Sequence, residues 1–170
     1  MELQLQLRST DGIPLKDPSR YRHLVGSLVY LTVTRPDISH AVHILSQFVC
    51  APTSVHYSHL LRVFRYLKGT TCRRLFYARN NQLQLHAYSH STWASDPNDR
   101  CSVTGYCLFL GTSLIAWKSK KQTAVARSSA EVELRALATT TSEIIWLRWL
   151  LADLGVSLRI CVHEFQIIRT

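Results

Sequence analysis

Polar residues in the second half of the sequence have types and spacing that could do chemistry. His90 ends a run of alternating apolar and polar residues, and Glu133 follows near the start of an expected helix. A carboxylate is a ligand for a hard cation such as Mg²⁺, whereas an imidazole suits zinc, copper or nickel better. A second group, Lys118, Lys120 and Lys121, could contact a nucleic-acid backbone or form a solvated cluster. The rest of the chain must position both groups.

Three strands and a long helix are expected around these groups, which indicates an α/β fold. The strands are predicted over residues 83–90, 103–110 and 113–117. The helix is predicted over 128–154, and its start reads as a capping box: Ser128 accepts from a free N–H group of the first turn, and Glu131 reaches back. Beyond it, alternating apolar residues over 158–162 predict a fourth strand.

The first half of the sequence predicts a helical segment. Its three helices are expected over residues 18–33, 36–48 and 54–68, with breaks at the prolines between them. We expect a loosely ordered leader over 1–16 and a short strand over 72–77. Arg62, Arg65 and Lys68 fall three apart on the third helix. This basic stripe could follow a phosphate backbone, or it could be the charged face of an ordinary amphipathic helix.

The charge of the chain favours polyanionic partners. The 170 residues carry a net charge of +9. Residues 1–80 hold 11 Lys and Arg against 4 Asp and Glu, so most of the excess lies in the first half. No apolar run has the length of a signal peptide or a membrane span, and the five dispersed cysteines suit reduced thiols. We therefore expect an intracellular protein, nuclear or cytoplasmic, without membrane contact.

Short motifs along the chain have the order and spacing of a known family. In the second half they are Ala87-Tyr88-Ser89, Trp93-Ala94, Asp96-Pro97, Asp99-Arg100, Thr104-Gly105-Tyr106, Trp117-Lys118-Ser119-Lys120-Lys121-Gln122 and Ser128 to Leu137. They resemble the ribonuclease H domain of copia-type retrotransposon Pol polyproteins. In the first half, Thr34-Arg35-Pro36-Asp37-Ile38 and Arg65-Tyr66-Leu67-Lys68-Gly69-Thr70 resemble the segment between the polymerase palm of these polyproteins and that domain.

The resemblance implies a nuclease that cuts RNA in an RNA–DNA hybrid with two Mg²⁺ ions held by carboxylates. Glu133 matches the catalytic glutamate of the family. His90 stands where the family has its first aspartate, and Thr92 stands where it commonly has a second acid. A single carboxylate cannot offset two divalent ions, so we expect that the ancestral Mg²⁺ pair does not bind and that RNA is not cut.

These inferences predict three parts: the leader 1–16, a helical segment 17–80 that resembles the thumb and connection region of a reverse transcriptase, and a truncated ribonuclease H-like domain 81–170. We expect a polyprotein fragment that binds an RNA–DNA hybrid or other nucleic acid weakly and is inactive. The alternative is a non-enzymatic nucleic-acid-binding module that acts through its basic helices. A third reading is a nuclease completed by another chain. We also expect self-association through uncovered faces of the long helix.

Overall fold

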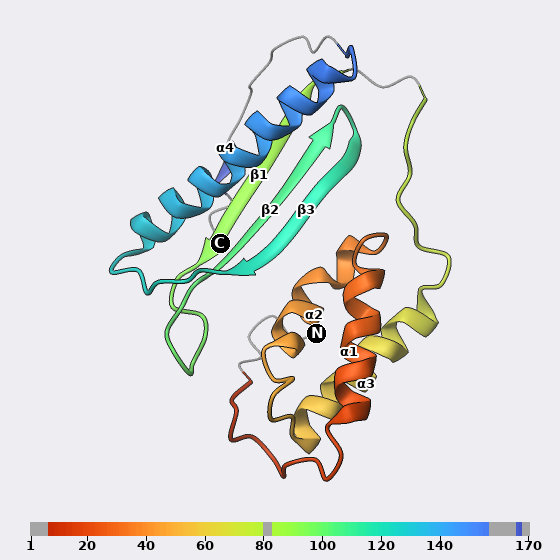
Figure 1. The fold of residues 1–170 in the computed structure, drawn as a ribbon, viewed down its shortest axis with the longest axis vertical. Helices are drawn as coiled ribbons and strands as arrows, with labels where there is room; N and C mark the ends of the chain where they lie inside the picture. The colour runs from red at the N-terminus through yellow and green to blue at the C-terminus, as the bar shows by residue number, and fades with distance from the viewer. Residues whose placement is uncertain (1–6, 80–82, 157–165, 168–170) are drawn as a thin grey trace. The chain divides into compact units, whose positions relative to one another are not determined.

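The chain divides into two compact units, Met1–Arg74 and Leu75–Thr170 (Figure 1). A computed structural model describes residues 7–79, 83–156 and 166–167. The first unit is helical, and the second combines a β-sheet with one long helix. Among the described helices there is none whose length and apolar character would let it span a lipid bilayer.

The first unit has the helices that the sequence predicts, with one change. They are α1 (Ser19–Leu31), the 3-10 helix η1 (Pro36–Ile38), α2 (Ser39–Ser46) and α3 (Ser54–Gly69). The predicted helix 36–48 is divided, because its first turn, which begins at Pro36, is a 3-10 turn. The predicted apolar faces form the core, which includes Tyr21, Val25, Leu28, Ile38, Val42, Leu45, Leu60 and Val63.

The described part of the leader differs from the loosely ordered segment that we expected. Leu7 is buried in the core of the helical unit. Pro14 forms a β-bridge with Thr53, and the Ser54 N–H donates to the Ile13 carbonyl at 2.8 Å. Because these contacts lie more than 30 residues apart in the sequence, local patterns give no sign of them. Residues 7–16 therefore belong to the helical unit.

A buried histidine fixes the start of α3. The Thr53 side chain accepts from the His56 N–H, and His56 Nδ1 lies 3.1 Å from the Thr53 nitrogen, so the two residues form a capping box. The His56 ring stacks on Phe48 with a centroid separation of 3.9 Å. Its Nε2 lies 3.0 Å from the Arg8 carbonyl oxygen. His56 thus joins the leader, the α2–α3 connection and the first turn of α3.

The strand predicted over residues 72–77 is not present. A strand needs a neighbour whose N–H and C=O groups pair with its own. None of the described strands pairs with this segment. Phe76 and Tyr77 are exposed, so the apolar residues that suggested a strand have no described core to pack against.

The second unit is an α/β arrangement with an antiparallel three-stranded sheet. Its elements are β1 (Leu85–Thr92), β2 (Val103–Leu110), β3 (Ser113–Lys121), α4 (Ser129–Asp153) and the two-residue β4 (Gln166–Ile167). The strand order is β3-β2-β1-β4, and β4 pairs parallel to β1. The fourth strand predicted over 158–162 lies outside the described residues. Strand β3 runs four residues further than predicted, which extends the β2–β3 hairpin.

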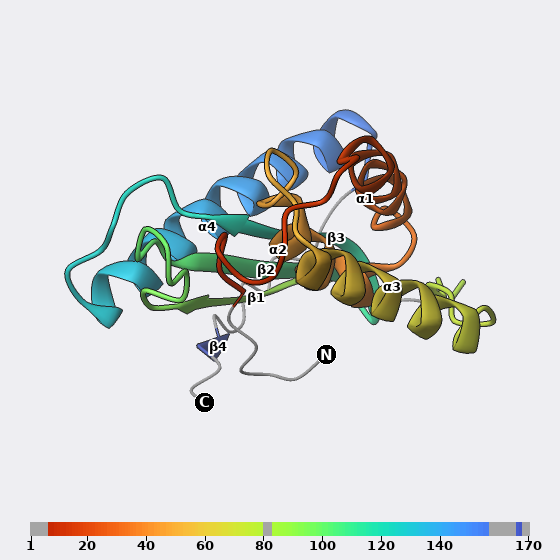
Figure 2. The same cartoon turned by 90° about the horizontal axis from the view of Figure 1, so that it is seen from below.

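Helix α4 covers one face of the sheet, along β1 (Figures 1 and 2). Ala87 of β1 and Leu108 of β2 pack with Leu147 of α4. The predicted helix stop is confirmed, because Gly155 has a φ of +73° and the Val156 N–H donates to the Leu151 carbonyl at 2.9 Å. This packing brings the first turns of α4 to the end of β1.

Candidate functional site

The structure brings His90 and Glu133 together at the end of β1. His90 Nδ1 lies 3.3 Å from Glu133 Oε1, and the two side chains are 32% and 20% exposed. His90 lies two residues before the last residue of β1, and Glu133 lies near the beginning of α4. The pair that the sequence indicated is therefore a real juxtaposition, partly shielded from solvent.

The backbone of β1 holds the Glu133 carboxylate in place. The Ser91 N–H donates to Glu133 Oε1 at 3.2 Å. Glu133 Oε2 and His90 Nδ1 are buried, and neither has a hydrogen-bond partner in the described part of the chain. The carboxylate therefore keeps one oxygen anchored to the strand and one oxygen unsatisfied.

The donor set at this place does not fit two magnesium ions. Mg²⁺ prefers oxygen ligands in octahedral geometry, and a pair of such ions needs several carboxylates. Within residues 7–79, 83–156 and 166–167, no group of three or more His, Cys, Asp or Glu side chains is placed to hold a metal ion. Thr92, where the resemblance to the family implies an acid, lies with its hydroxyl 3.0 Å from Ser95 Oγ in the following turn.

The start of α4 differs in part from the predicted capping box. Ser128 accepts from the Glu131 N–H at 3.2 Å, which confirms its role as the cap. The Glu131 carboxylate instead accepts from the Arg127 N–H at 2.8 Å and from the Arg135 guanidinium at 2.6 Å. Glu131 is therefore used by local contacts, and Glu133 is the carboxylate that turns toward β1.

Lys121 forms ion pairs within the fold. Its ammonium group pairs with Asp96 and, at 2.7 Å, with Asp99. Burial acts to raise the pKa of Asp96, but hydrogen bonds from Lys121 and the Asn98 N–H outweigh it, so the pKa lies below the ordinary value. Lys121 therefore ties the end of β3 to the loop between β1 and β2, a role that the sequence did not indicate.

The other predicted basic residues lie on two further elements, β3 and α3. Lys118 and Lys120 are exposed on β3, two strands from β1 in the sheet. Arg62, Arg65 and Lys68 are exposed on α3, in the other unit. This exposure fits both interpretations of the basic stripe, a surface for a phosphate backbone and the charged face of an amphipathic helix.

Sequence reasoning missed a structural role of Gln122. Its Nε2 group donates to Ser91 Oγ at 3.2 Å, to Thr104 Oγ1 at 3.0 Å and to the Val132 carbonyl at 3.2 Å. One amide thereby joins β1, β2 and α4 at Ser91, the residue whose N–H holds Glu133. The only sequence signal was its place at the end of the Trp117–Gln122 motif.

Comparison with known proteins places the chain among transposon proteins. It is 50% identical over 147 residues to the retrovirus-related Pol polyprotein from transposon RE2 of Arabidopsis thaliana, a match that covers 86% of this chain and 10% of that protein. It is 39% identical over 137 residues to the corresponding polyprotein from transposon TNT 1-94 of Nicotiana tabacum, covering 80% of this chain and 10% of that protein. A shorter relative, the secreted RxLR effector protein 161 of Plasmopara viticola, is 43% identical over 128 residues, which are 75% of this chain and 90% of that protein.

The chain spans about a tenth of the length of the two Pol polyproteins. No protein-family model matches it, and no solved structure matches it. The level of identity over most of its residues is nevertheless well above what unrelated chains share. The chain belongs to the family of copia-type retrotransposon Pol polyproteins.

Proposed function

We propose that the second unit is part of a ribonuclease H-like domain that binds an RNA–DNA hybrid weakly and does not cut its RNA strand. The order of three antiparallel strands, a long helix and a parallel fourth strand supports this assignment. So does the position of Glu133, which α4 brings to the end of β1.

The observation that carries the proposed loss of cleavage is the 3.3 Å contact between His90 Nδ1 and Glu133 Oε1. The resemblance to the family implies an aspartate at the position of this imidazole. A neutral imidazole brings no negative charge, and a protonated one would repel a cation. Two divalent ions held close together need several anionic oxygens nearby, and this pair supplies one carboxylate.

A second candidate function is nucleic-acid binding by the helical unit, without any enzymatic role. The exposed side chains of Arg62, Arg65 and Lys68 on α3 favour it. Residues three apart on a helix lie near one another on its surface, so these cations present a continuous basic strip. By the resemblance of this segment to the region that follows the polymerase palm, we propose that the strip contacts a template–primer.

A labelled RNA–DNA hybrid, mixed with the full chain in Mg²⁺, tests both functions. Binding is measured by fluorescence anisotropy over a range of salt concentrations, and cleavage is measured on a denaturing gel. We expect weak, salt-sensitive binding and no RNA fragments above background. Arg62→Gln combined with Arg65→Gln should weaken binding and flatten its salt dependence, since each phosphate contact adds about 0.9 to the slope.

The matched control combines Lys16→Gln with Arg20→Gln, which removes two exposed charges from the same unit outside the stripe. If control and stripe variants bind alike, the attraction comes from net charge and the second candidate fails. Release of RNA fragments by the wild type, abolished by Glu133→Gln, would refute the proposed inactivity. Absence of any hybrid binding would refute both functions.

A further inference from the structure

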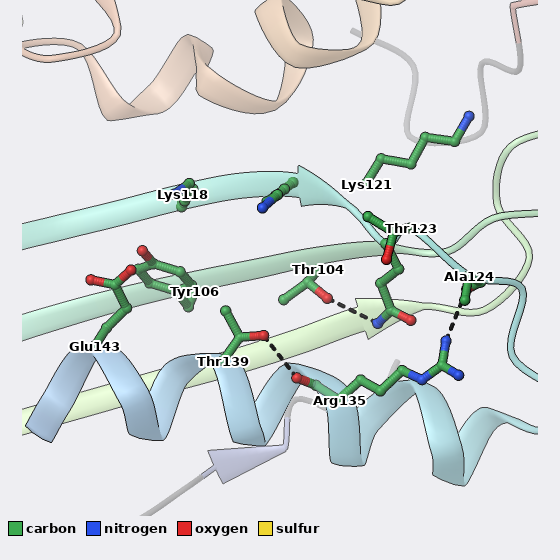
Figure 3. Close-up of a pocket in the computed structure, with 11 residues that line it drawn as sticks. Thr104, Tyr106, Lys118, Lys121, Thr123, Ala124, Arg135, Thr139 and Glu143 are labelled. Atoms are coloured by element: carbon green, nitrogen blue, oxygen red, sulfur yellow. Dashed lines mark hydrogen bonds between the residues drawn. The ribbon is translucent and has the colours of Figure 1, made fainter.

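A pocket between α4 and strands β2 and β3 is not used by the pair at the end of β1 (Figure 3). Its volume is about 330 Å³. That volume is in the range of small-molecule sites in proteins. The sheet contributes Thr104, Lys118 and Lys120 to its lining, and the helix contributes Arg135, Thr139 and Glu143.

The register of the sheet and the repeat of the helix bring these residues together. In the β2–β3 ladder, Lys120 lies opposite Thr104 and Lys118 lies opposite Tyr106, so both lysines share the sheet face of those residues. From α4, Arg135, Thr139 and Glu143 line the pocket, and their spacing of four residues puts them on one side of the helix. The pocket is therefore built from regular elements rather than from loops.

Cations outnumber acids in the lining, and two of these cations, Lys118 and Lys120, are available to a ligand. Lys118 and Lys120 are exposed, and in the part of the chain that the structure describes no side-chain hydrogen bond or ion pair involves either of them. Lys121 differs, because it pairs with Asp96 and its side chain extends away from α4 in Figure 3. Glu143 is the single acid of the lining.

Other lining groups are held in fixed positions. The Arg135 guanidinium donates to the Ala124 carbonyl at 2.9 Å and to Glu131 at 2.6 Å, which fixes its place at the pocket wall. The Thr104 hydroxyl oxygen accepts from Gln122 Nε2 at 3.0 Å, so its own O–H is left to donate. A buried donor that is already oriented costs little entropy when a ligand binds.

We propose that this pocket holds a phosphate group, which accepts from the ammonium groups of Lys118 and Lys120 and from the Thr104 hydroxyl. Two ammonium groups and one hydroxyl can each donate to an oxygen of a phosphate, and charge-assisted hydrogen bonds of this kind are strong. The group comes either from a nucleic-acid backbone, an origin that rests on the proposed function, or from a free mononucleotide. Glu143 limits the site, because its charge repels an anion at the Tyr106 end.

The test is a titration of the full chain with inorganic phosphate and with AMP, followed by amide resonances in NMR spectra. We expect saturable shifts at Thr104 and Lys120. Lys118→Gln combined with Lys120→Gln should weaken AMP binding by about tenfold or more, the equivalent of one lost charge-assisted hydrogen bond. Glu143→Gln should tighten it, while the Lys16→Gln and Arg20→Gln control should bind as the wild type does.

The opposite effects of the lysine and Glu143 variants separate binding from damage to the fold, because unfolding could only weaken binding. If phosphate and AMP cause no shifts in the pocket, or if the lysine variant binds them like the wild type, the pocket proposal is overturned, even where the hybrid still binds. If AMP binds in the pocket but the hybrid does not bind the chain, the proposed hybrid binding fails and the mononucleotide is the source. Weaker hybrid binding by the lysine variant, but not by the control, identifies the backbone as the source.

Discussion

Replacing His90 by aspartate tests the electrostatic reasoning at the end of β1. The substitution puts a second carboxylate beside Glu133, in a place where the two present side chains are 32% and 20% exposed. We expect His90→Asp to lower the stability of the second unit in the absence of divalent ions. We also expect Mg²⁺ to restore much of that stability, whereas Mg²⁺ should leave the wild type unchanged.

The size of the effect follows from the geometry. Aspartate is shorter than histidine, so the two carboxylates would lie roughly 5 Å apart, where Coulomb repulsion is about 3 kcal/mol at an effective dielectric constant of about 20. Partial exposure to water reduces this to about 1 to 2 kcal/mol. For a unit of this size, a loss of that free energy lowers the melting temperature by about 5 to 10 °C.

Tryptophan fluorescence reports on the right unit, because all four tryptophans, Trp93, Trp117, Trp146 and Trp149, lie in it. Melting curves of the wild type, His90→Asp and the uncharged His90→Asn are compared with and without Mg²⁺. Adding Glu133→Gln to His90→Asp should remove the repulsion and most of the Mg²⁺ effect. The reasoning is refuted if the aspartate and asparagine variants melt alike, or if Mg²⁺ stabilises the wild type as much as the aspartate variant.

Three further predictions concern stability and association. Lys121→Met should lower the free energy of unfolding by about 2 to 3 kcal/mol in urea titrations, because it leaves the buried Asp96 carboxylate unpaired; a loss below about 0.5 kcal/mol would contradict this. Burial lowers the pKa of His56, so protonation of this side chain favours the unfolded state. The contribution of neutral His56 to the free energy of unfolding is therefore present above about pH 6.5 and is lost as the pH falls below that. Urea titrations by circular dichroism should show this loss, and a smaller loss in His56→Gln, since the pKa of His40 is also lowered by desolvation and His40 therefore acts with the same sign. Trp149 is 68% exposed on α4, and we expect sedimentation that depends on concentration in the wild type but less so in Trp149→Ser.

The features that the sequence predicted correctly are local ones. Ser128 caps α4, Gly155 ends it, and residues 103–110 form a strand with the predicted bounds. Each depends on the chemistry of one residue or on alternation over a few neighbours. Such signals do not need the rest of the chain to be known.

The features that the sequence did not predict depend on distant partners. Lys121 pairs with Asp96 across 25 residues, and the loop that permits this has Ala94 and Arg100 at positive φ, a conformation that neither residue type indicates. His56 reaches the Arg8 carbonyl across 48 residues and so orders the leader. The strand expected over 72–77 is absent for the converse reason, because none of the described strands pairs with these strand-like residues.

At the candidate site, the position of Glu133 and the charge of its neighbour at position 90 are set by different parts of the structure. The Ser91 N–H that holds Glu133 belongs to the backbone of β1, so it anchors the carboxylate whatever side chain stands at position 90. A change from aspartate to histidine can therefore remove negative charge without moving the glutamate. Introducing an acid at position 90 should accordingly create an electrostatic response to Mg²⁺ but not cleavage, because cleavage needs further carboxylates that this pair does not supply.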